Sequence, residues 1–191
     1  KIYQPSFFGS VANIAIKKIS LSLMDNFPDF FKELYHALRL ANVKVLSNTY
    51  VNMMVLGVLS GFIAGIFFFG LFFAATALPI GQMILRTFFM SILLAMSVFA
   101  GFYAYPYQKL KARRRSINTN LPFAINHMAA VAGSGVSPVR MFKLISESKE
   151  YGDVSVEIEK IVNYVEIFGY DILTALKAIA STTPSNEFKD F

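Results

Sequence analysis

Two long stretches without a charged side chain limit the fold of this chain more than any other feature. The first runs 41 residues from Val45 to Leu85, and the second runs 22 residues from Thr87 to Gln108, with Arg86 between them. A bilayer core about 30 Å thick needs roughly 20 apolar residues in an α-helix, which rises about 1.5 Å per residue. The two stretches therefore predict two transmembrane helices.

The segment from Ala77 to Gly81 contains Pro79 and interrupts the first stretch, which is too long for one span. We expect one helix near Val51 to Leu78 and another near Ile84 to Tyr107. The short turn between them would hold Arg86, the one charge of the predicted hairpin.

Positive charges gather on both sides of this hairpin. Residues 1–47 carry six Lys/Arg against three Asp/Glu, residues 48–107 carry Arg86 alone, and residues 108–191 carry eleven Lys/Arg against nine Asp/Glu. Because Lys and Arg are enriched in cytoplasmic segments beside membrane spans, both flanking segments are predicted to be cytoplasmic and the turn external. The expected location is the cell membrane, with a multi-pass topology.

The same division gives the expected domains. They are N-terminal cytosolic amphipathic helices (1–47), a two-helix transmembrane hairpin (48–107) and a cytosolic helical module (108–191). Because no alternating strand pattern competes with the helical periodicity, the predicted fold class is an all-α membrane protein: a transmembrane helical hairpin with a cytosolic antiparallel helical bundle. The chain begins without Met and stops at Phe191 inside a predicted helix, so we expect a fragment of a longer protein.

Capping residues predict where the cytosolic helices begin and end. Asn, Ser, Asp and Thr favour helix starts, Pro favours the first turn, and Gly favours the position after a helix. The predicted starts are Asn120, Ser137, Asp153, Asp171 and Thr183. The predicted ends are the Gly133-Ser134-Gly135 turn, Lys149 and Gly169. The predicted inward residues are Val154, Ile158, Ile161, Val162, Val165, Phe168, Leu173, Leu176, Ile179 and Ala180.

Two helices are expected before the hairpin. The first, from Pro5 to Leu23, is weakly amphipathic and is predicted to lie along the membrane or to pack on a neighbouring helix, through Val11, Ile14, Ala15 and Ile19. The second begins near Pro28 and places one apolar face inward. That face is formed by Phe27, Phe31, Leu34, Leu38 and Ala41.

The first span contains three glycines at four-residue spacing, Gly57, Gly61 and Gly65. Small residues at this spacing let helix backbones approach closely inside a membrane, where lipid supplies no hydrophobic drive between helices. The face is predicted to pack against the second span, or against another protomer or helices outside this sequence.

A basic cluster follows the second span and comprises Lys109, Lys111, Arg113, Arg114 and Arg115. Such a cluster sets topology and binds anionic headgroups. It is also a candidate contact for an acidic cytoplasmic partner, and the two roles are compatible.

The sequence offers no pattern typical of a catalytic, cofactor or metal site. It has no cysteine, and His36 and His127 each lack a second ligand at helical spacing. Glu157 and Glu159 are two residues apart on a predicted helix, so they point in different directions and do not form a catalytic pair. A pore or pump is disfavoured because the hairpin has no ionisable group at depth. Nucleic-acid binding is not expected, since the basic excess lies beside the membrane.

The order of several short motifs resembles a known family. They are LRLANVKV (38–45), LPFAINHMA (121–129), SGVSP (134–138), GYDILTAL (169–176) and TPSNEF (183–188), with the hairpin and basic cluster between the first and second. Over residues 30–191 this order resembles the type II secretion system F domain, most closely the archaeal form found in the membrane platform proteins of archaella and archaeal type IV pili.

This resemblance implies a non-enzymatic inner-membrane platform. Such a protein recruits a cytoplasmic hexameric secretion ATPase, couples it to assembly of pilin-like or archaellin subunits, and is expected to form homo-oligomers such as dimers. Two alternatives remain open. The chain could be a fragment of a polytopic transporter, or of a membrane-embedded enzyme whose active residues lie outside this sequence.

Overall fold

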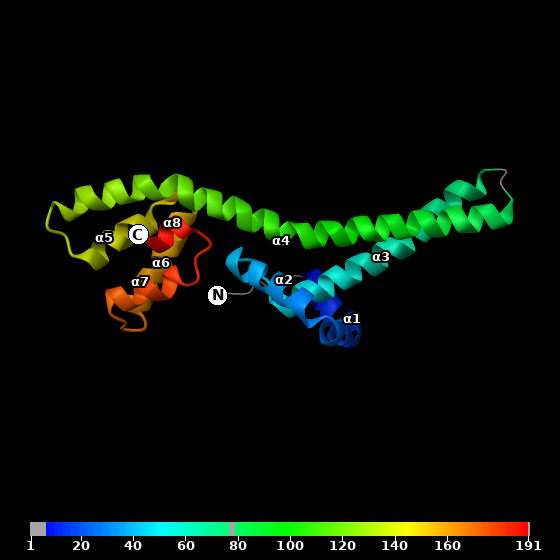
Figure 1. The fold of residues 1–191 in the computed structure, drawn as a ribbon, viewed down its shortest axis with the longest axis horizontal. Helices are drawn as coiled ribbons and strands as arrows, with labels where there is room; N and C mark the ends of the chain where they lie inside the picture. The colour runs from blue at the N-terminus through cyan, green and yellow to red at the C-terminus, as the bar shows by residue number, and fades with distance from the viewer. Residues whose placement is uncertain (1–6, 77–78, 191) are drawn as a thin grey trace. The chain divides into compact units, whose positions relative to one another are not determined.

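The chain folds into two compact units in the computed structural model, which describes residues 7–76 and 79–190 (Figure 1). Unit 1 comprises residues 1–108 and unit 2 comprises residues 109–191. Over the described residues the secondary structure consists of eight α-helices and one 3-10 helix, without strands. The all-α prediction is therefore confirmed for this part of the chain.

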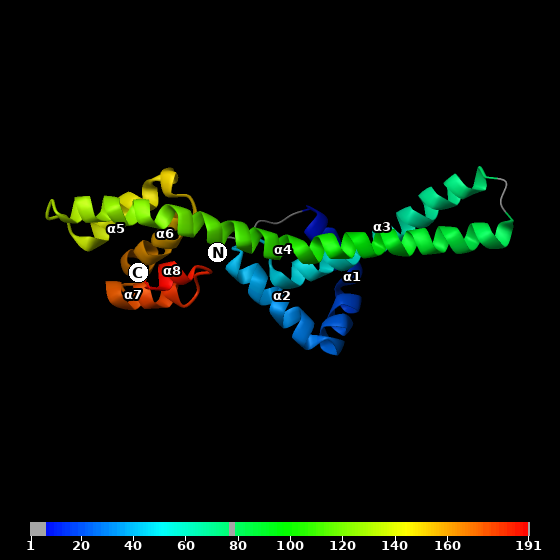
Figure 2. The ribbon, with the colours of Figure 1, turned by 45° about the horizontal axis from the view of Figure 1, so that its top comes forward.

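Unit 1 contains α1 (Phe7–Asn26), α2 (Pro28–Leu40), α3 (Ser47–Ala74) and the first part of α4 (Ile80–Ala132). Figures 1 and 2 both show α3 beside the first part of α4. α3 begins four residues before the predicted Val51, and α4 begins four residues before the predicted Ile84. Arg86 consequently lies inside α4 and not in a turn, while Ala77 and Leu78 lie outside the described residues.

α1 packs on α3, but through a different face from the one predicted. Val11 and Ile14 are 39% and 87% exposed, whereas Ala12 and Ile16 are buried and Ser20 is 1% exposed. The predicted side chains of Ala15 and Ile19 lie outside the described part of the structure.

Hydrogen bonds between polar side chains explain which face of α1 is buried. Asn52 of α3 donates through Nδ2 to Asn13 Oδ1 at 2.6 Å and accepts a hydrogen bond from the Ser20 hydroxyl. Asn13 also donates to Thr49 Oγ1 at 3.2 Å. Because a buried amide without partners is costly, these contacts fix α1 with Asn13 and Ser20 toward α3.

α2 buries the predicted residues Phe31, Leu34, Leu38 and Ala41. Phe27, predicted on the same face, is 60% exposed. It is the N-cap residue with φ −130° and ψ 58°, so it lies outside the helical register that the other four share.

The length of α4 differs from the prediction more than any other feature of the fold. A new helix was expected to start at Asn120, but α4 continues unbroken from Ile80 to Ala132, through Pro122. The Asn120 side chain donates to the Ser116 carbonyl at 3.0 Å, one turn back, and does not cap a helix. The apolar stripe of Ile117 and Leu121 continues across Pro122, and its burial outweighs the one backbone hydrogen bond that proline removes.

Unit 2 builds its core from the last part of α4 together with α5 (Pro138–Glu147), η1 (Lys149–Tyr151), α6 (Asp153–Glu166), α7 (Ile172–Ala180) and α8 (Asn186–Asp190). The buried side chains recur at helical spacing on each element. They include Ile117, Leu121, Ala124, Met128, Phe142, Ile145, Val154, Ile158, Ile161, Val162, Ala175, Ile179 and Phe188. The predicted Val165 and Leu176 pack against this core while partly buried, and Ala180 is also partly buried.

Two predicted inward residues are exposed. Phe168 is 66% exposed because α6 ends at Glu166, so Phe168 no longer follows the helical stripe. Leu173 is 57% exposed because Ile172 and Leu176 occupy the side of α7 that faces the core.

The predicted helix boundaries in unit 2 are confirmed at some caps and corrected at others. Asp171 accepts a hydrogen bond from the Leu173 amide at 3.1 Å, as expected for an N-cap. Gly169 adopts φ 69° after α6, which favours glycine. Asp153 is instead the first residue of α6, after an N-cap at Gly152. Ser185 caps α8 by accepting from the Phe188 amide at 3.2 Å.

Candidate functional site

Three exposed basic residues of α4 lie on one face of unit 2. Lys111, Arg114 and Arg115 are exposed and stand at helical positions i, i+3 and i+4. Together with Asn118, Thr119 and Glu187 they line an open groove of about 460 Å³, which we call the basic groove. At 100° per residue these five α4 positions span about 140° of the helix surface, next to the buried stripe that contains Ile117 and Leu121.

The far wall of the basic groove is α8, which is held on α4 through Asn118. Asn118 donates to Glu187 Oε1 at 2.8 Å and accepts from the Ser185 hydroxyl at 2.6 Å. Phe188, buried in the core, anchors the short helix from the other side. The one carboxylate of the groove is thus bonded to an amide, and the cations outnumber it three to one.

Arg113 was predicted to be a partner contact, and the structure corrects this. Its side chain is 5% exposed and donates through Nη2 to Oε1 of Glu157, which is fully buried. Glu157 also accepts from Lys160 Nζ at 2.8 Å, and Asp153 lies 3.5 Å from Arg113 Nε. A buried, paired guanidinium is not available to a headgroup or to another protein, so Arg113 stabilises unit 2.

The position of Arg113 in the sequence already indicates that its side chain is buried. Arg113 precedes Ile117 by four residues and Leu121 by eight, so it lies on the apolar stripe of α4. Glu157 lies among the buried residues of α6 in the same way. Opposite charges on two apolar stripes indicate a buried ion pair.

Lys109, the remaining member of the predicted cluster, is exposed but does not line the basic groove. It precedes Lys111 by two residues, and residues at that spacing do not share a helix face. The predicted cluster of five therefore divides into three groove residues, one cation on another side of α4, and one buried residue.

The predicted glycine face lies against α4 within unit 1. A Cβ added at Gly57 would come within 2.7 Å of the Phe102 ring, and one at Gly61 within 3.2 Å of Val98. At Gly65 it would lie 3.0 Å from the Cα of Ser91. The contacted residue number on α4 falls as the glycine number rises, so the two helices pack antiparallel.

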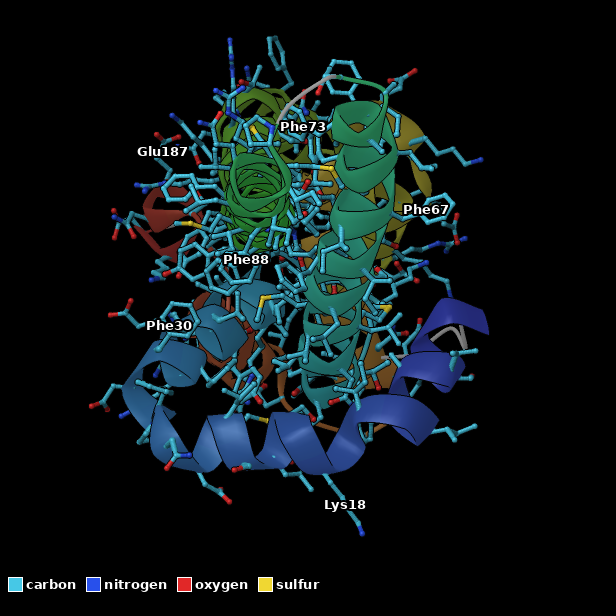
Figure 3. All side chains as sticks on the ribbon, turned by 90° about the vertical axis from the view of Figure 1, so that its right-hand side faces the viewer. Lys18, Phe30, Phe67, Phe73, Phe88 and Glu187 are labelled. Carbon is cyan, nitrogen blue, oxygen red and sulfur yellow. The ribbon has the colours of Figure 1, made fainter. Side chains whose placement is uncertain are left out.

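The apolar surfaces of α3 and α4 are largely uncovered by the chain itself. Both helices are long and apolar enough to cross a membrane. Only 11% of an 18-residue apolar segment in each helix is buried by the rest of the chain. The core helix of a water-soluble domain would be mostly buried. In Figure 3 the ring of Phe67, which is 71% exposed, points away from α4. Two helices of this kind could place unit 1 in a membrane.

His127 has a structural contact. Its Nδ1 lies 2.7 Å from the Tyr151 hydroxyl, which connects α4 to η1. In the described ranges no group of three or more His, Cys, Asp or Glu side chains is placed to hold a metal ion.

Comparisons with known proteins find similarity to parts of archaeal proteins from Methanocaldococcus jannaschii. Flagella accessory protein J is 28% identical over 101 residues, which cover 52% of this chain and 18% of that protein. The uncharacterized protein MJ1286 is 34% identical over 83 residues (44% of this chain, 14% of that protein), and the uncharacterized protein MJ0780 is 31% identical over 86 residues (45% and 24%).

This chain thus spans a quarter or less of the length of these relatives. No protein-family profile matches it. No solved structure matches it. The similarity to Flagella accessory protein J associates the chain with an archaellum-related protein.

Proposed function

We propose that this chain is part of a non-enzymatic platform protein in the cell membrane, belonging to an archaellum, an archaeal type IV pilus or a related type II secretion-like machine. The platform recruits a cytoplasmic hexameric secretion ATPase and couples it to assembly of pilin-like or archaellin subunits. The exposed apolar helices and the similarity to Flagella accessory protein J support this proposal.

The basic groove is the observation that carries the proposal. Its three cations lie on α4, the same helix that supplies the second apolar stretch ending at Gln108. Lys111 follows Gln108 by three residues, about 4.5 Å along the helix. Guanidinium groups at Arg114 and Arg115 can form bidentate hydrogen bonds with carboxylates. An acidic surface of the ATPase is the partner we assign to this groove.

In this proposal both termini of the chain are cytoplasmic and the α3–α4 connection is external. The cations that flank the hairpin on both sides support that orientation. The platform acts as a homo-oligomer, such as a dimer, so that it presents more than one basic groove to a hexameric ATPase.

The test uses the full-length protein in nanodiscs of uncharged lipid, with the secretion ATPase of the same organism. In one variant, Lys111, Arg114 and Arg115 are changed together to Gln, while Arg113 keeps its buried partner. Three exposed charge pairs of about 0.5 kcal/mol each sum to about 1.5 kcal/mol, so binding should weaken roughly tenfold. Wild-type binding should also weaken as salt rises, since exposed charges are screened over about 10 Å at 0.1 M.

A matched control removes the same charge elsewhere on unit 2. Arg140, Lys149 and Lys177 are exposed and do not line the basic groove, and they are changed together to Gln. The control should bind the ATPase as the wild type does. Equal affinities for all three proteins would overturn the docking role of the groove.

A further inference from the structure

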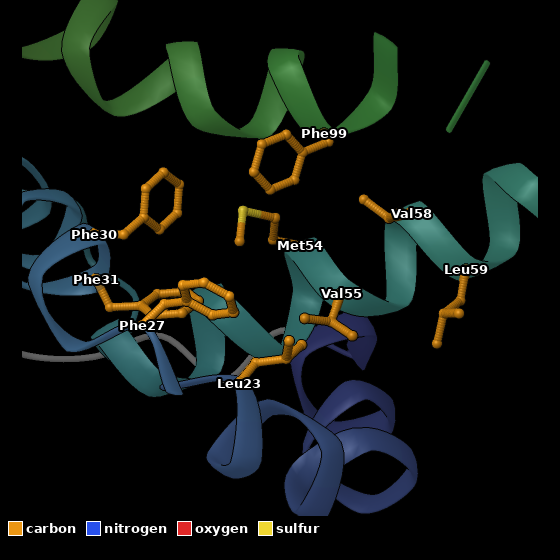
Figure 4. A pocket seen from close by; sticks show the side chains of 9 residues that line it. All are labelled: Leu23, Phe27, Phe30, Phe31, Met54, Val55, Val58, Leu59 and Phe99. Atoms are coloured by element: carbon orange, nitrogen blue, oxygen red, sulfur yellow. The ribbon is translucent and has the colours of Figure 1, made fainter. Parts of the chain in front are cut away.

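An apolar groove of about 490 Å³ lies within unit 1, apart from the basic groove (Figure 4). It is formed by the α1–α2 corner and by α2, α3 and α4. Leu23, Phe27 and Phe30 line one side, Val55 and Leu59 line the α3 side, and Phe99 of α4 closes it. We call it the apolar groove.

The chemistry of the lining limits what can occupy the apolar groove. Among the residues that the structure describes, none of the side chains lining this groove carries a nitrogen or an oxygen atom. Sites for metabolites and cofactors combine apolar walls with a few polar groups that orient the ligand. Without such a group, this groove selects for hydrocarbon.

Two kinds of hydrocarbon-rich occupant are considered for the groove, a helix and a lipid chain, and the size of the groove favours the lipid chain. One turn of helix about 10 Å wide with a 5.4 Å pitch occupies roughly 420 Å³, so the groove holds little more than one turn. A membrane helix also docks through small residues that let backbones approach, and the glycines of α3 are already packed against α4. A lipid chain can bind in a groove this short, and it needs no small residues in the wall of the groove.

The groove is continuous with the apolar surface of α3. Leu59 and Phe99 at its edge are 42% and 39% exposed, and Ile63, one turn further along α3, is 66% exposed. A lipid beside α3 could therefore reach the groove without crossing a polar surface.

We propose that the apolar groove binds one hydrocarbon chain of a membrane lipid and thereby covers the apolar side chains of α2 that face α3. This inference rests on one element of the proposed function, the placement of α3 and α4 in a membrane. It is independent of the ATPase.

This chain contains no tryptophan, so its positions can carry a single reporter. A single Trp is introduced at Phe30 in the groove (F30W), or at exposed Phe67 on α3 as a control (F67W), in full-length protein in which any Trp outside residues 1–191 has been changed to Phe. Each variant is reconstituted with phosphatidylcholine whose acyl chains are dibrominated, because bromine quenches a Trp that it contacts. The protein is then extracted into detergent and washed free of loosely held lipid.

Both reporters should be quenched in the vesicles. After washing, F30W should keep most of its quenching while F67W recovers its fluorescence. A second reporter at the groove edge, Leu59→Trp, should behave as F30W and guards against misfolding of one variant. Filling the groove with Val58→Phe in the F30W background should abolish the retained quenching, whereas Ile63→Phe, outside the groove, should not.

The failures are distinguishable. If F67W is not quenched in vesicles, α3 is not in contact with lipid and the membrane placement itself is wrong. If F67W is quenched there but F30W and Leu59→Trp lose their quenching on washing, the groove binds no lipid chain. Retained quenching that Val58→Phe leaves unchanged would also overturn the inference.

Discussion

The Arg113 guanidinium donates to the Glu157 carboxylate inside unit 2, and this ion pair joins α4 to α6. Glu157 is fully buried and also accepts from Lys160, whose side chain is 30% exposed. A charge at this depth is tolerated because its partners replace the water that it loses. Neither Arg113 nor Glu157 should therefore tolerate a substitution that removes its charge while the other keeps its own.

Removing one partner of this pair should destabilise unit 2 severely. Arg113→Met leaves Glu157 with Lys160, and Glu157→Leu removes the buried carboxylate from the Arg113 guanidinium and leaves it the partly exposed Asp153, 3.5 Å from Nε. Breaking a buried pair costs about 3–5 kcal/mol, so each variant should unfold at a markedly lower temperature or denaturant concentration. Thermal unfolding of the purified protein followed by circular dichroism measures this.

The double variant Arg113→Met with Glu157→Leu tests whether the uncompensated charge is the cause. Replacing both charges by apolar residues of similar volume is often neutral or stabilising, so the double variant should recover most of the lost stability. A double variant as unstable as the sum of the two single ones would refute this account.

Gly65 should tolerate substitution least among the three glycines of α3. An added Cβ there would lie 3.0 Å from a backbone atom of Ser91, whereas at Gly57 the nearest neighbour is a Phe102 ring that can turn. Gly65→Ile should cost about 1–3 kcal/mol or more and lower the yield of folded protein in membranes. Ala64→Ile on the exposed neighbouring position should be tolerated; equal yields for both variants would show that the contact is dispensable.

The orientation of the hairpin can be checked by cysteine labelling, because this chain contains no cysteine and any cysteine elsewhere in the full-length protein can be changed to Ser. Single cysteines at Ser10, Gly81 and Lys149 replace exposed residues. A membrane-impermeant thiol reagent applied to intact cells should label only the variant at Gly81, and all three should react after lysis. Labelling of Ser10→Cys or Lys149→Cys in intact cells would reverse the proposed topology.

The phenol of Tyr35 on α2 should lose its proton at a higher pH than an ordinary tyrosine. Burial raises the pKa of its phenol above the ordinary value, and its hydroxyl donates to Met24 Sδ at 2.9 Å. Because the raised pKa belongs to the folded state, the stability this group contributes is complete below about pH 10 and is lost as pH rises through the folded pKa. Alkaline difference absorbance of wild type minus Tyr35→Phe should show a late phenolate transition. An ordinary tyrosine titration would contradict it.

The sequence determined the class of the fold because its strongest signals are local. The uncharged stretches and the helical spacing of Phe31, Leu34 and Leu38 depend only on neighbouring residues, and the structure has helices at these places. The cap at Asp171 is equally local, since its carboxylate bonds an amide two residues away. The three glycines could be recognised as a packing face from their spacing alone.

Tertiary contacts decided what local signals could not. Asn120 and Pro122 are typical of a helix start, but α4 continues through them because Ile117 and Leu121 are buried. Polar contacts with Asn52, not the apolar residues Val11 and Ile14, decide which face of α1 is buried. The basic cluster is one group in the sequence. The spacing to Ile117 and Leu121 indicates that Arg113 lies on the apolar stripe of α4, and the structure shows that Glu157 on α6 is its buried partner. Which of several adjacent charges is buried depends on its partner, and that partner lies 44 residues away along the chain.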